Sequence, residues 1–581
     1  MTYILGLSCF YHDSAACLLK DGQVIAAAHE ERFTRKKHDA DYPQNAISFC
    51  LNHAGITSKD LSHVAYYEKP FIKFDRILST HLSEAPFGIA SFLKAMPLWI
   101  KEKLWISSLI QKKLKYQGPL IFPEHHESHA ASSFFCSPFQ EAAIMTLDGV
   151  GEWSTATVGY GRGNKITLQK EIQFPHSLGL LYSAFTYFLG FKVNSAEYKV
   201  MGLAPYGKPK YVNLIMNHLI DVKEDGSFKI NLEYFSYTYG LRMINQKFST
   251  LFQRSPRKKE DRLTQDDFDI AASIQKVTED VVLRIAAAVR KETGMKNLCL
   301  AGGVALNCVA NGKVLREAGY ENIFIQPAAG DAGGAIGAAL LTHYALLNNE
   351  KTNKAMPHPF LGPSFSNEEI EKTLVQCNAI YEKISQEEVV QKTAQHISDQ
   401  QVVGWFQGRS EFGPRALGGR SILADPRNKE MKDTVNLKIK FRESFRPFAP
   451  TVLAEHVQEY FELHQESPHM LLTAQVKENK RVIPSVTHVD GSARVQTIKR
   501  EDHPLYYDLI HEFYKLTGVP VIINTSFNVR GEPIVGNPKD AFQCFMGTHM
   551  DTLVIGNFLL EKKKQKNIKE FKNYYKTFPL D

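Results

Sequence analysis

The stretch that decides the fold lies at residues 3–28 and reads YILGLSCFYHDSAACLLKDGQVIAAA. Apolar runs at residues 3–8, 10–19 and 24–28 alternate with short polar segments, which favours three strands in succession. The Lys-Asp-Gly-Gln segment between the second and third runs has the composition of a tight hairpin turn. These residues predict an antiparallel opening to a β-sheet, followed by a helix over residues 42–54.

The same pattern returns in the middle of the chain. Three strand-like segments joined by Gly-rich turns lie at residues 142–147, 155–160 and 166–172. A long helical stretch at residues 269–293 and a short buried strand at residues 297–300 come after them. A hairpin plus strand that occurs twice, each time followed by helices, is how the two halves of the actin-like ATPase fold begin. We therefore expect an α/β protein whose first domain has two similar halves.

Two histidines and two aspartates form the first chemical motif. His125 and His129 are four residues apart, so on a helix both imidazoles leave the same face. Asp148 and Asp331 each follow an apolar run, where a parallel strand would deliver its side chain to a shared crevice. Two imidazoles and two carboxylates suit a divalent ion of the Fe, Mn or Zn type.

Glycines stand at turns close to these residues. The four that we single out are Gly149, Gly302, Gly303 and Gly334. Glycine lets the backbone come close to a ligand, and the amide groups of turns and helix starts bind phosphate. The histidines, aspartates and glycines together predict a metal-assisted nucleotide site.

Composition limits the class of protein. At 581 residues the chain is longer than one ordinary domain, and its 44% hydrophobic and 23% charged residues are typical of a folded enzyme. A net charge of +7 favours anionic ligands but does not mark a nucleic-acid binder. The eight cysteines form no CxxC pair and no secretory signal precedes them, so we expect reduced thiols in the cytoplasm. The chain has no apolar run long enough to predict a transmembrane segment.

A change of composition marks the expected domain boundary. Residues 346–365 are rich in Asn, Lys, Pro and Gly and show little apolar periodicity. We expect a first domain at residues 1–348, a linker at residues 349–365 and a second domain at residues 366–581. Ser366 has the chemistry to cap the first helix of that second domain.

Residues 87–115 mix bulky apolar side chains with lysines. A basic amphipathic helix of this composition can lie on an anionic membrane. Such a face more often packs on a core or on a partner subunit, and the sequence leaves this choice open.

Arginines among turn-forming residues make a second cluster in the C-terminal part. The segment GRSEFGPRALGGRS lies at residues 408–421. Guanidinium groups bind phosphate and carboxylate oxygens in pairs, and small-residue turns let backbone amides take part. We interpret Arg415, Arg420 and Arg446 as part of a pocket for a compact dianion such as a phosphate ester or an acyl phosphate. Further candidates for this pocket are Lys440, Arg442, Arg494, Asn528 and Arg530.

Five longer strings carry a resemblance to a known family. They are FYHDSAA at residues 10–16, EERFTRKKH at 30–38, GLAPYG at 202–207, GPRALG at 413–418 and NTSFN at 524–528. Taken together they resemble, over nearly the whole chain, the O-carbamoyltransferases, which include nodulation, cephamycin and tobramycin carbamoyltransferases. The resemblance implies an actin-like ATPase N-terminal domain, similar to the tRNA threonylcarbamoyl transferase. It also implies an α/β C-terminal domain, a twisted mixed sheet similar to the threonylcarbamoyl-AMP synthase YrdC.

The resemblance also implies roles for individual residues. The metal, iron(II) in this family, would be held by His125, His129, Asp148 and Asp331. The nucleotide would lie against Gly149, Gly302, Gly303, Asn307 and Gly334, with Lys37 a weaker candidate. Carbamoyl phosphate would be bound by Arg415, Lys440, Arg446, Arg494, Asn528 and Arg530. The candidates for a general base are His12, Asp13 and His126, and the sequence does not choose among them.

We therefore expect an ATP-dependent O-carbamoyltransferase that makes carbamoyl-AMP from carbamoyl phosphate and ATP in its C-terminal domain. The N-terminal domain would transfer the carbamoyl group to a hydroxyl of a sugar or natural product. The expected partners are these small molecules, without nucleic acid, and a homo-oligomer is compatible with the sequence. The alternatives are a tRNA-modifying threonylcarbamoyl transferase-like fusion, an actin-like kinase or metal hydrolase, and a non-catalytic nucleotide-binding or assembly protein.

Overall fold

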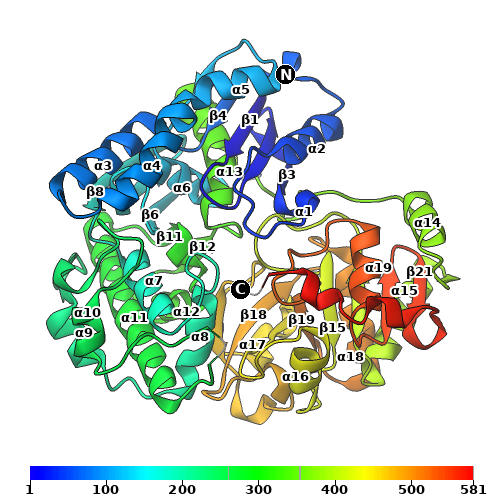
Figure 1. Ribbon diagram of the computed structural model, residues 1–581. Coiled ribbons are helices and arrows are strands. Elements are labelled where there is room, and N and C mark those ends of the chain that lie inside the picture. Colours follow the sequence, from blue (N-terminus) through cyan, green and yellow to red (C-terminus); the bar gives the residue numbers. More distant parts are fainter. Residues whose placement is uncertain (260, 353–354, 580–581) are drawn as a thin grey trace. The chain divides into compact units, whose positions relative to one another are not determined.

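The computed structural model describes residues 1–259, 261–352 and 355–579. The chain divides into two compact units, which Figure 1 shows in sequence colours. Unit 1 contains Met1–Glu30 and Ala40–Pro357, and unit 2 contains Glu31–Asp39 and His358–Asp581. The division after Pro357 falls inside the predicted linker, of which residues 353–354 lie outside the described residues. Within the described residues, every helix is too short or too polar to span a bilayer.

The first sheet of unit 1 has the strand order β3-β2-β1-β4-β5. Its strands are β1 (Tyr3–Ser8), β2 (Ala15–Lys20), β3 (Gln23–His29), β4 (His63–Tyr66) and β5 (Leu120–Ile121). The predicted antiparallel opening is confirmed, since β1 pairs with β2 and β2 with β3 in antiparallel register. The second strand begins later than predicted, because Phe10 (φ 73°) and Asp13 (φ 53°) adopt left-handed conformations that a strand cannot contain.

The second sheet of unit 1 repeats this layout with the order β12-β11-β6-β7-β8. Its strands are β6 (Glu141–Leu147), β7 (Ser154–Arg162), β8 (Lys165–Gln173), β11 (Asn297–Ala301) and β12 (Asn322–Ile325). An antiparallel meander is again extended by two parallel strands on the side of its first strand, as β1 pairs with β4 and β6 with β11. This duplication confirms the predicted actin-like halves of an α/β domain.

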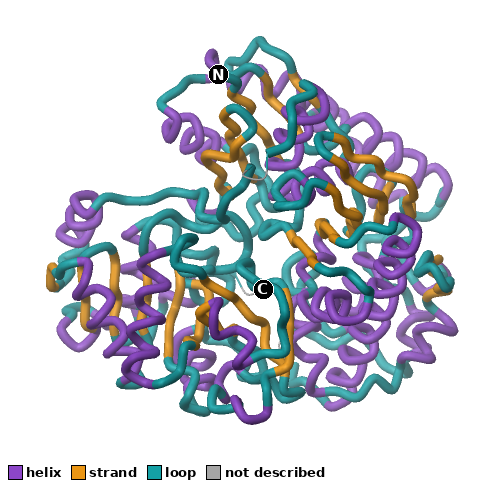
Figure 2. The backbone as a smooth tube through the Cα atoms, turned by 180° about the vertical axis from the view of Figure 1, so that it is seen from behind, coloured by secondary structure: helices purple, strands orange, loops and turns teal. Residues whose placement is uncertain are grey.

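Two helices pack between these sheets. Figure 2 shows the helices and strands of the chain from behind. Helix α13 (Asp331–Leu341) lies against the first sheet and helix α6 (His125–Phe134) against the second. The helices touch each other so closely that a Cβ atom on Gly337 would lie 1.7 Å from the carbonyl oxygen of Ser128. A Cβ atom on Gly6 of β1 would likewise lie 1.9 Å from the carbonyl oxygen of Ala335. Glycine is therefore required at both positions for the layers to meet.

The other elements of unit 1 surround this centre. The predicted helix at 269–293 is α11 (Gln265–Thr293), which begins at a capping box formed by Thr264 and Asp267 and ends at Gly294 in the left-handed conformation. The predicted helix at 42–54 is α2 (Gln44–Ala54), and the remaining bounds are α3 (Pro70–Ser83), α4 (Ile89–Lys101), α5 (Ile106–Leu114), α7 (Leu178–Phe188), α8 (Glu197–Leu203), α9 (Val212–His218), β9 (Ile220–Val222), β10 (Phe228–Ile230), α10 (Gln246–Leu251) and α12 (Cys308–Glu317).

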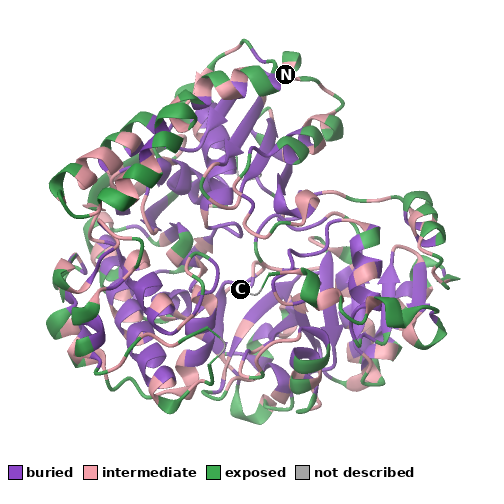
Figure 3. Ribbon diagram, in the orientation of Figure 1, coloured by how far each residue is buried: buried purple, intermediate pink, exposed green. Residues whose placement is uncertain are grey.

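Unit 2 is built on one mixed sheet with the order β13-β21-β20-β14-β15-β19-β16-β18-β17. Its strands are β13 (Glu382–Lys383), β14 (Val403–Phe406), β15 (Arg420–Ala424), β16 (Ala449–Leu453), β17 (Leu472–Gln475), β18 (Ser492–Ile498), β19 (Val521–Ser526), β20 (Thr552–Ile555) and β21 (Phe558–Glu561). The helices are α14 (Asn367–Gln376), α15 (Gln386–Ser398), α16 (Met431–Asp433), α17 (Val457–Tyr460), α18 (Pro504–Thr517) and α19 (Pro538–Met546). The predicted mixed sheet is confirmed, and Ser366 caps α14 as predicted. In both units the central strands are largely buried (Figure 3), and in unit 1 helices α6, α11 and α13 are largely buried with them.

A short segment from the N-terminal part belongs to unit 2. Residues Glu31–Asp39, which include helix α1 (Glu31–Thr34), cluster with the C-terminal residues, although the sequence placed them in the first domain. Arg35 pairs with Glu532 at 2.8 Å and with Asp540 at 3.3 Å, and it donates to the carbonyl oxygen of Ile534 at 2.7 Å. This long-range set of polar contacts has no signature in the local sequence, which is why it was missed.

Replacing Arg35 by alanine tests how much this segment stabilises unit 2. Arg35→Ala leaves the buried carboxylates of Glu532 and Asp540 without their counter-charge, a loss that costs about 3–5 kcal/mol. We expect an earlier urea unfolding transition and faster hydrogen exchange in residues 529–540. The control Arg162→Ala removes an exposed pair with Glu141 and should change neither measurement. Equal behaviour of the two variants would show that the Arg35 contacts do not stabilise unit 2.

Candidate functional site

The four predicted metal ligands come together in unit 1. His125 and His129 lie one turn apart on α6, Asp148 follows the end of β6, and Asp331 is the first residue of α13. Their donor atoms lie within 4.8 Å of one another. The expectation that Asp331 ends a strand was wrong, because β12 stops before a loop of residues 326–330. Asp331 instead reaches the site from the start of a helix.

The distances within this cluster fit a divalent ion. His125 Nε2 lies 3.0 Å from Asp148 Oδ2 and 3.0 Å from His129 Nε2. Asp331 Oδ1 lies 3.6 Å from His125 Nε2 and 3.8 Å from His129 Nε2. The other carboxylate oxygen of Asp331 is buried and accepts no hydrogen bond from the residues that the structure describes, which is costly unless a cation is nearby. Two imidazole nitrogens and two carboxylates that face a common point are a suitable donor set for a transition metal.

Residues to which the sequence analysis gave no role hold His125 in place. Glu68 Oε2 lies 3.4 Å from His125 Nδ1 and pairs with Lys73 Nζ at 2.5 Å. Burial alone would raise the pKa of Glu68, but Lys73 and His125 lower it to about 2. Glu152 accepts hydrogen bonds from the backbone N–H of His125 at the start of α6, where the helix dipole favours a carboxylate. Glu68 follows β4 as Asp148 follows β6, and this equivalence was the available sequence signal.

His12 and Asp13 lie beside the metal-ligand cluster. His12 Nδ1 is 3.0 Å from Asp13 Oδ2, and its Nε2 is 3.8 Å from Asp331 Oδ2. Burial alone would lower the pKa of His12, but Asp331 and Asp13 raise it to about 10. About a quarter of each side chain is exposed, so both are open to an incoming molecule.

His126 has different surroundings from His12. Its Nδ1 lies 2.6 Å from Thr146 Oγ1 on β6, and Thr146 Oγ1 lies 2.6 Å from Thr157 Oγ1 on β7. Burial, together with His125 and His129, lowers the pKa of His126 well below its usual value. His126 is therefore held neutral against the sheet and is almost fully buried.

Two of the predicted nucleotide glycines adjoin Asp148. The backbone N–H of Gly303 donates to Asp148 Oδ1 at 2.9 Å. Gly302 has a φ of 89°, and a Cβ atom there would lie 2.2 Å from the carbonyl oxygen of Leu147. Only glycine meets both constraints. Gly149 has open space where a Cβ atom would stand.

The other predicted nucleotide residues are placed differently. Asn307 caps α12 and exchanges hydrogen bonds with Gln275 at 3.0 and 3.1 Å. Gly334 lies inside α13, where a Cβ atom would come within 2.9 Å of the ring of Tyr67, so helix packing accounts for the glycine. Lys37 lies in the segment that belongs to unit 2, whereas the other predicted nucleotide residues lie in unit 1.

Unit 2 brings together four of the six predicted anion-binding residues. Lys440 Nζ is buried and donates to Asn528 Oδ1 at 2.6 Å and to the carbonyl oxygen of Asn528 at 3.0 Å. Burial, together with the nearby Arg442, lowers the pKa of Lys440 well below its usual value. The backbone N–H of Arg530 donates to the carbonyl oxygen of Lys440 at 3.1 Å. Arg446 completes the group through Glu443, which lies 2.7 Å from Arg446 Nη2 and 3.8 Å from Arg530 Nη2.

Three other arginines that the sequence analysis assigned to the anion pocket have different surroundings from one another. Arg494 lies on β18 and Arg415 in the loop between β14 and β15. Arg420 is fully buried, stacks 3.6 Å from the ring centre of Phe406, and donates to four backbone carbonyl oxygens at 2.8–3.0 Å. The interpretation of Arg420 as an anion ligand is therefore corrected, because the fold itself uses its donors.

Comparison with protein families decides the class of protein. The family profile described as Carbamoyltransferase N-terminus matches residues 3–340, and the one described as Carbamoyltransferase C-terminus matches residues 394–562. The chain belongs to the carbamoyltransferase family. The resemblance inferred from the sequence is confirmed, and the carbamoyltransferase is an enzyme of the predicted class.

Relatives of this carbamoyltransferase cover most or all of its length. Nodulation protein NolNO of Sinorhizobium fredii is 39% identical over 95% of this chain and 79% of its own. Nodulation protein NolO of Bradyrhizobium diazoefficiens is 40% identical over 76% of this chain and 79% of its own. An uncharacterized protein of Synechocystis is 54% identical over the full length of both chains. The solved HypF of T. kodakarensis aligns over 61% of this chain and 49% of its own, at 14% identity and a TM-score of 0.32.

Metal titration of variants tests the site in this carbamoyltransferase. His125→Ala or Asp331→Ala removes a donor atom and should abolish tight metal binding. Glu68→Gln keeps all four donors but loses the carboxylate that orients His125, and it should weaken metal affinity roughly tenfold to a hundredfold. The exposed variant Glu141→Gln serves as control. Full metal content in His125→Ala would refute the site, and wild-type affinity in Glu68→Gln would refute the positioning role.

Proposed function

We propose that this carbamoyltransferase is ATP-dependent and works in two steps, one in each unit. Unit 2 makes carbamoyl-AMP from carbamoyl phosphate and ATP, and unit 1 transfers the carbamoyl group to a hydroxyl of a sugar or natural-product acceptor. The observation that carries the proposal is the presence of two separate constellations. A cluster of buried cations and an amide lies in unit 2, and a cluster of metal-ligand side chains lies in unit 1.

The chemistry explains why two steps are useful. Carbamate is a poor electrophile because resonance stabilises its carboxylate, and a mixed anhydride with AMP gives its carbon a good leaving group. Hydrolysis of carbamoyl phosphate yields carbamate and phosphate, and carbamate then displaces pyrophosphate from ATP to form carbamoyl-AMP. Attack by the acceptor hydroxyl releases AMP and the carbamoylated product. Water must be kept from the intermediate, which is prone to hydrolysis.

In unit 2 the cationic residues bind the anionic substrate. Arg446 and Arg530 carry the charges that match the oxygens of a phosphate group. Lys440 Nζ is held by oxygens of Ser526 and Asn528, so Lys440 would contribute its charge and not a free hydrogen-bond donor. Asn528 fixes the ammonium group of Lys440 by accepting its hydrogen bond. A bound dianion would favour the charged form of Lys440, because a nearby opposite charge opposes the effect of burial. Arg415 and Arg494 are proposed to complete the pocket.

In unit 1 the metal-ligand cluster and its neighbours would act on carbamoyl-AMP. The ion, which we propose to be iron(II), would supply Lewis-acid polarisation when bound to His125, His129, Asp148 and Asp331. The backbone near Gly149, where open space leaves room for a ligand, would hold the phosphate of the adenylate, while the N–H of Gly303 orients Asp148.

Coordination of Asp331 to a bound ion would neutralise the main charge that raises the pKa of His12, and for this metal-bound state we assign His12 as the general base. Its partial exposure supports this role over His126, which is buried against the sheet. Asp13 would hold the imidazole in orientation through the contact at 3.0 Å. A positioned base typically contributes about 10²–10⁴-fold to the rate.

Product analysis tests the proposed reaction. With ATP, carbamoyl phosphate and a hydroxyl-bearing acceptor such as an aminoglycoside or a chitin oligosaccharide, we expect AMP, pyrophosphate, phosphate and a carbamoylated product. Formation of ADP in place of AMP would instead identify a kinase-like reaction. Formation of threonylcarbamoylated tRNA in a parallel assay with ATP, threonine, bicarbonate and tRNA would favour the threonylcarbamoyl transferase-like alternative. Mass spectrometry of the nucleotides and of the acceptor distinguishes these outcomes.

Replacing Arg446 separates the two steps. Arg446→Ala removes a charge-assisted contact to phosphate and should weaken carbamoyl phosphate binding roughly tenfold to a hundredfold. Transfer from synthetic carbamoyl-AMP to the acceptor should remain, because the metal-ligand cluster in unit 1 is unchanged. Arg500→Ala, which alters an exposed arginine of the same unit, serves as control and should leave both steps unchanged. An equal loss of both steps in a folded Arg446→Ala protein would refute the two-site proposal.

A further inference from the structure

The outer side of helices α3, α4 and α5 exposes an unusual amount of apolar surface. Six large side chains between residues 82 and 105 are each more than half exposed: Leu82, Phe87, Ile89, Leu93, Ile100 and Trp105. These helices form an outer layer of unit 1, largely exposed or half-buried in Figure 3. A concentration of bulky apolar groups on one surface marks a place that binds another surface. We call the outer side of residues 70–115 the apolar-basic face.

Helix α4 exposes bulky apolar side chains although it is a surface helix. Met96 and Trp99 are buried, and the ring of Trp99 lies 5.9 Å from that of Phe74 on α3. Ile89, Leu93 and Ile100 share one face of the helix at helical spacing and are each more than half exposed. A surface helix usually exposes polar side chains, so an exposed apolar row of this kind indicates a surface that binds a partner.

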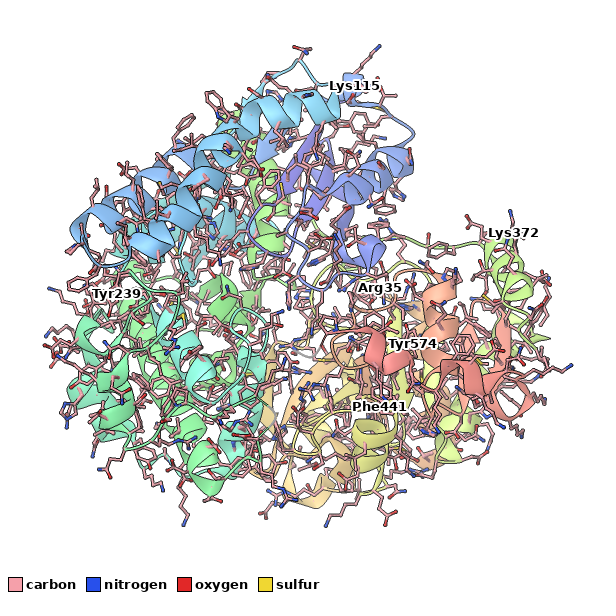
Figure 4. The ribbon with its side chains drawn as sticks, viewed as in Figure 1. Arg35, Lys115, Tyr239, Lys372, Phe441 and Tyr574 are labelled. Carbon is pink, nitrogen blue, oxygen red and sulfur yellow. The ribbon has the colours of Figure 1, made fainter. Side chains whose placement is uncertain are left out.

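The same layer concentrates the positive charge of the chain. Residues 89–115 contain six lysines and one glutamate, a net charge of +5 out of the chain's +7. Lys103 turns inward and donates to the carbonyl oxygen of Phe10. The five other lysines are exposed: Lys94, Lys101, Lys112, Lys113 and Lys115. Figure 4 labels Lys115 just beyond the end of α5 and Tyr239 at the other end of the layer, where Tyr239 accepts a hydrogen bond from Ser91.

We infer that the apolar-basic face binds the surface of a membrane that contains anionic phospholipids. Bulky apolar side chains enter the boundary between head groups and acyl chains, and lysines beside them contact the phosphates. On α4, Lys94 adjoins Leu93 and Lys101 adjoins Ile100, so both kinds of contact occur side by side. Charge argues against a second copy of this chain as the occupant, because a symmetric dimer would bring two strongly positive faces together.

Membrane binding through the apolar-basic face would use different residues from the reaction that we propose for unit 1. Lys73 on the inner side of α3 points to Glu68, whereas Phe71 and Leu82 on the outer side are exposed. The apolar-basic face shares no side chain with the metal-ligand cluster. Membrane binding therefore does not depend on the proposed reaction, and a failure of either can be recognised separately.

Vesicle flotation with the full chain tests the inference. We expect flotation with vesicles of phosphatidylcholine and phosphatidylglycerol, little with phosphatidylcholine alone, and less as salt is added. The double variant Leu93→Ser/Ile100→Ser should lower the partition coefficient roughly tenfold, because two apolar anchors are lost. Lys94→Gln and Lys101→Gln should each lower it about fivefold.

Matched controls on α14 separate a specific face from general surface effects. Val375→Ser alters an apolar side chain that is 60% exposed, close to the 65% of Leu93, and Lys372→Gln removes an exposed lysine from the same helix. Both controls should float like the unaltered chain, and unchanged circular dichroism and metal content should show that every variant is folded. Absence of flotation, or equal flotation of Leu93→Ser/Ile100→Ser and Val375→Ser, would overturn the inference. A dimer in light scattering that Leu93→Ser abolishes would also overturn it, by assigning the face to a second copy.

Discussion

The convergence of two imidazoles and two carboxylates at one buried point constrains most of unit 1. His125 and His129 must start a helix close to the end of β6, and Asp331 must start a second helix against the first. These helices reach the required distance only because Gly337 has no side chain to keep them apart. Glu68, paired with Lys73, then orients His125. A donor set of this kind is unfavourable by itself, so the fold holds a cluster that an ion would stabilise.

Unit 2 brings basic side chains close together, whereas unit 1 brings carboxylates and imidazoles together. Lys440 is buried with its ammonium group hydrogen-bonded to Asn528, and Arg446 and Arg530 share the carboxylate of Glu443. Glu443 offsets part of the repulsion between the two guanidinium groups. Buried arginines are not all equivalent, however. Arg420 donates to four carbonyl oxygens and is a part of the fold.

Membership of the carbamoyltransferase family connects these two clusters in one enzyme. The family profiles match residues 3–340 and 394–562, which include the metal-ligand cluster and the cation cluster respectively. The segment Glu31–Asp39 ties the N-terminal part of the chain into unit 2 through Arg35. A cut within the predicted linker would therefore break the covalent connection but leave the non-covalent contacts of Arg35 with unit 2 in place. The chain passes from one unit to the other after Glu30, after Asp39 and after Pro357.

The sequence by itself determined the elements with a strong local signal. The hairpin at β2 and β3, most of helix α11, the cap of α14 and the spacing of the histidine pair on α6 follow from periodicity, turn residues and capping residues. The capping box at Thr264, which precedes the predicted start of α11 at residue 269, was not predicted. Only the tertiary structure decided which distant residues meet. In the structure Asp331 lies at the start of a helix, and Glu68 contacts His125. Arg420 donates its hydrogen bonds to backbone carbonyl oxygens, and Arg35 pairs with Glu532. Local sequence sets backbone preferences over a few residues, whereas these contacts depend on how sheets and helices stack across hundreds of residues.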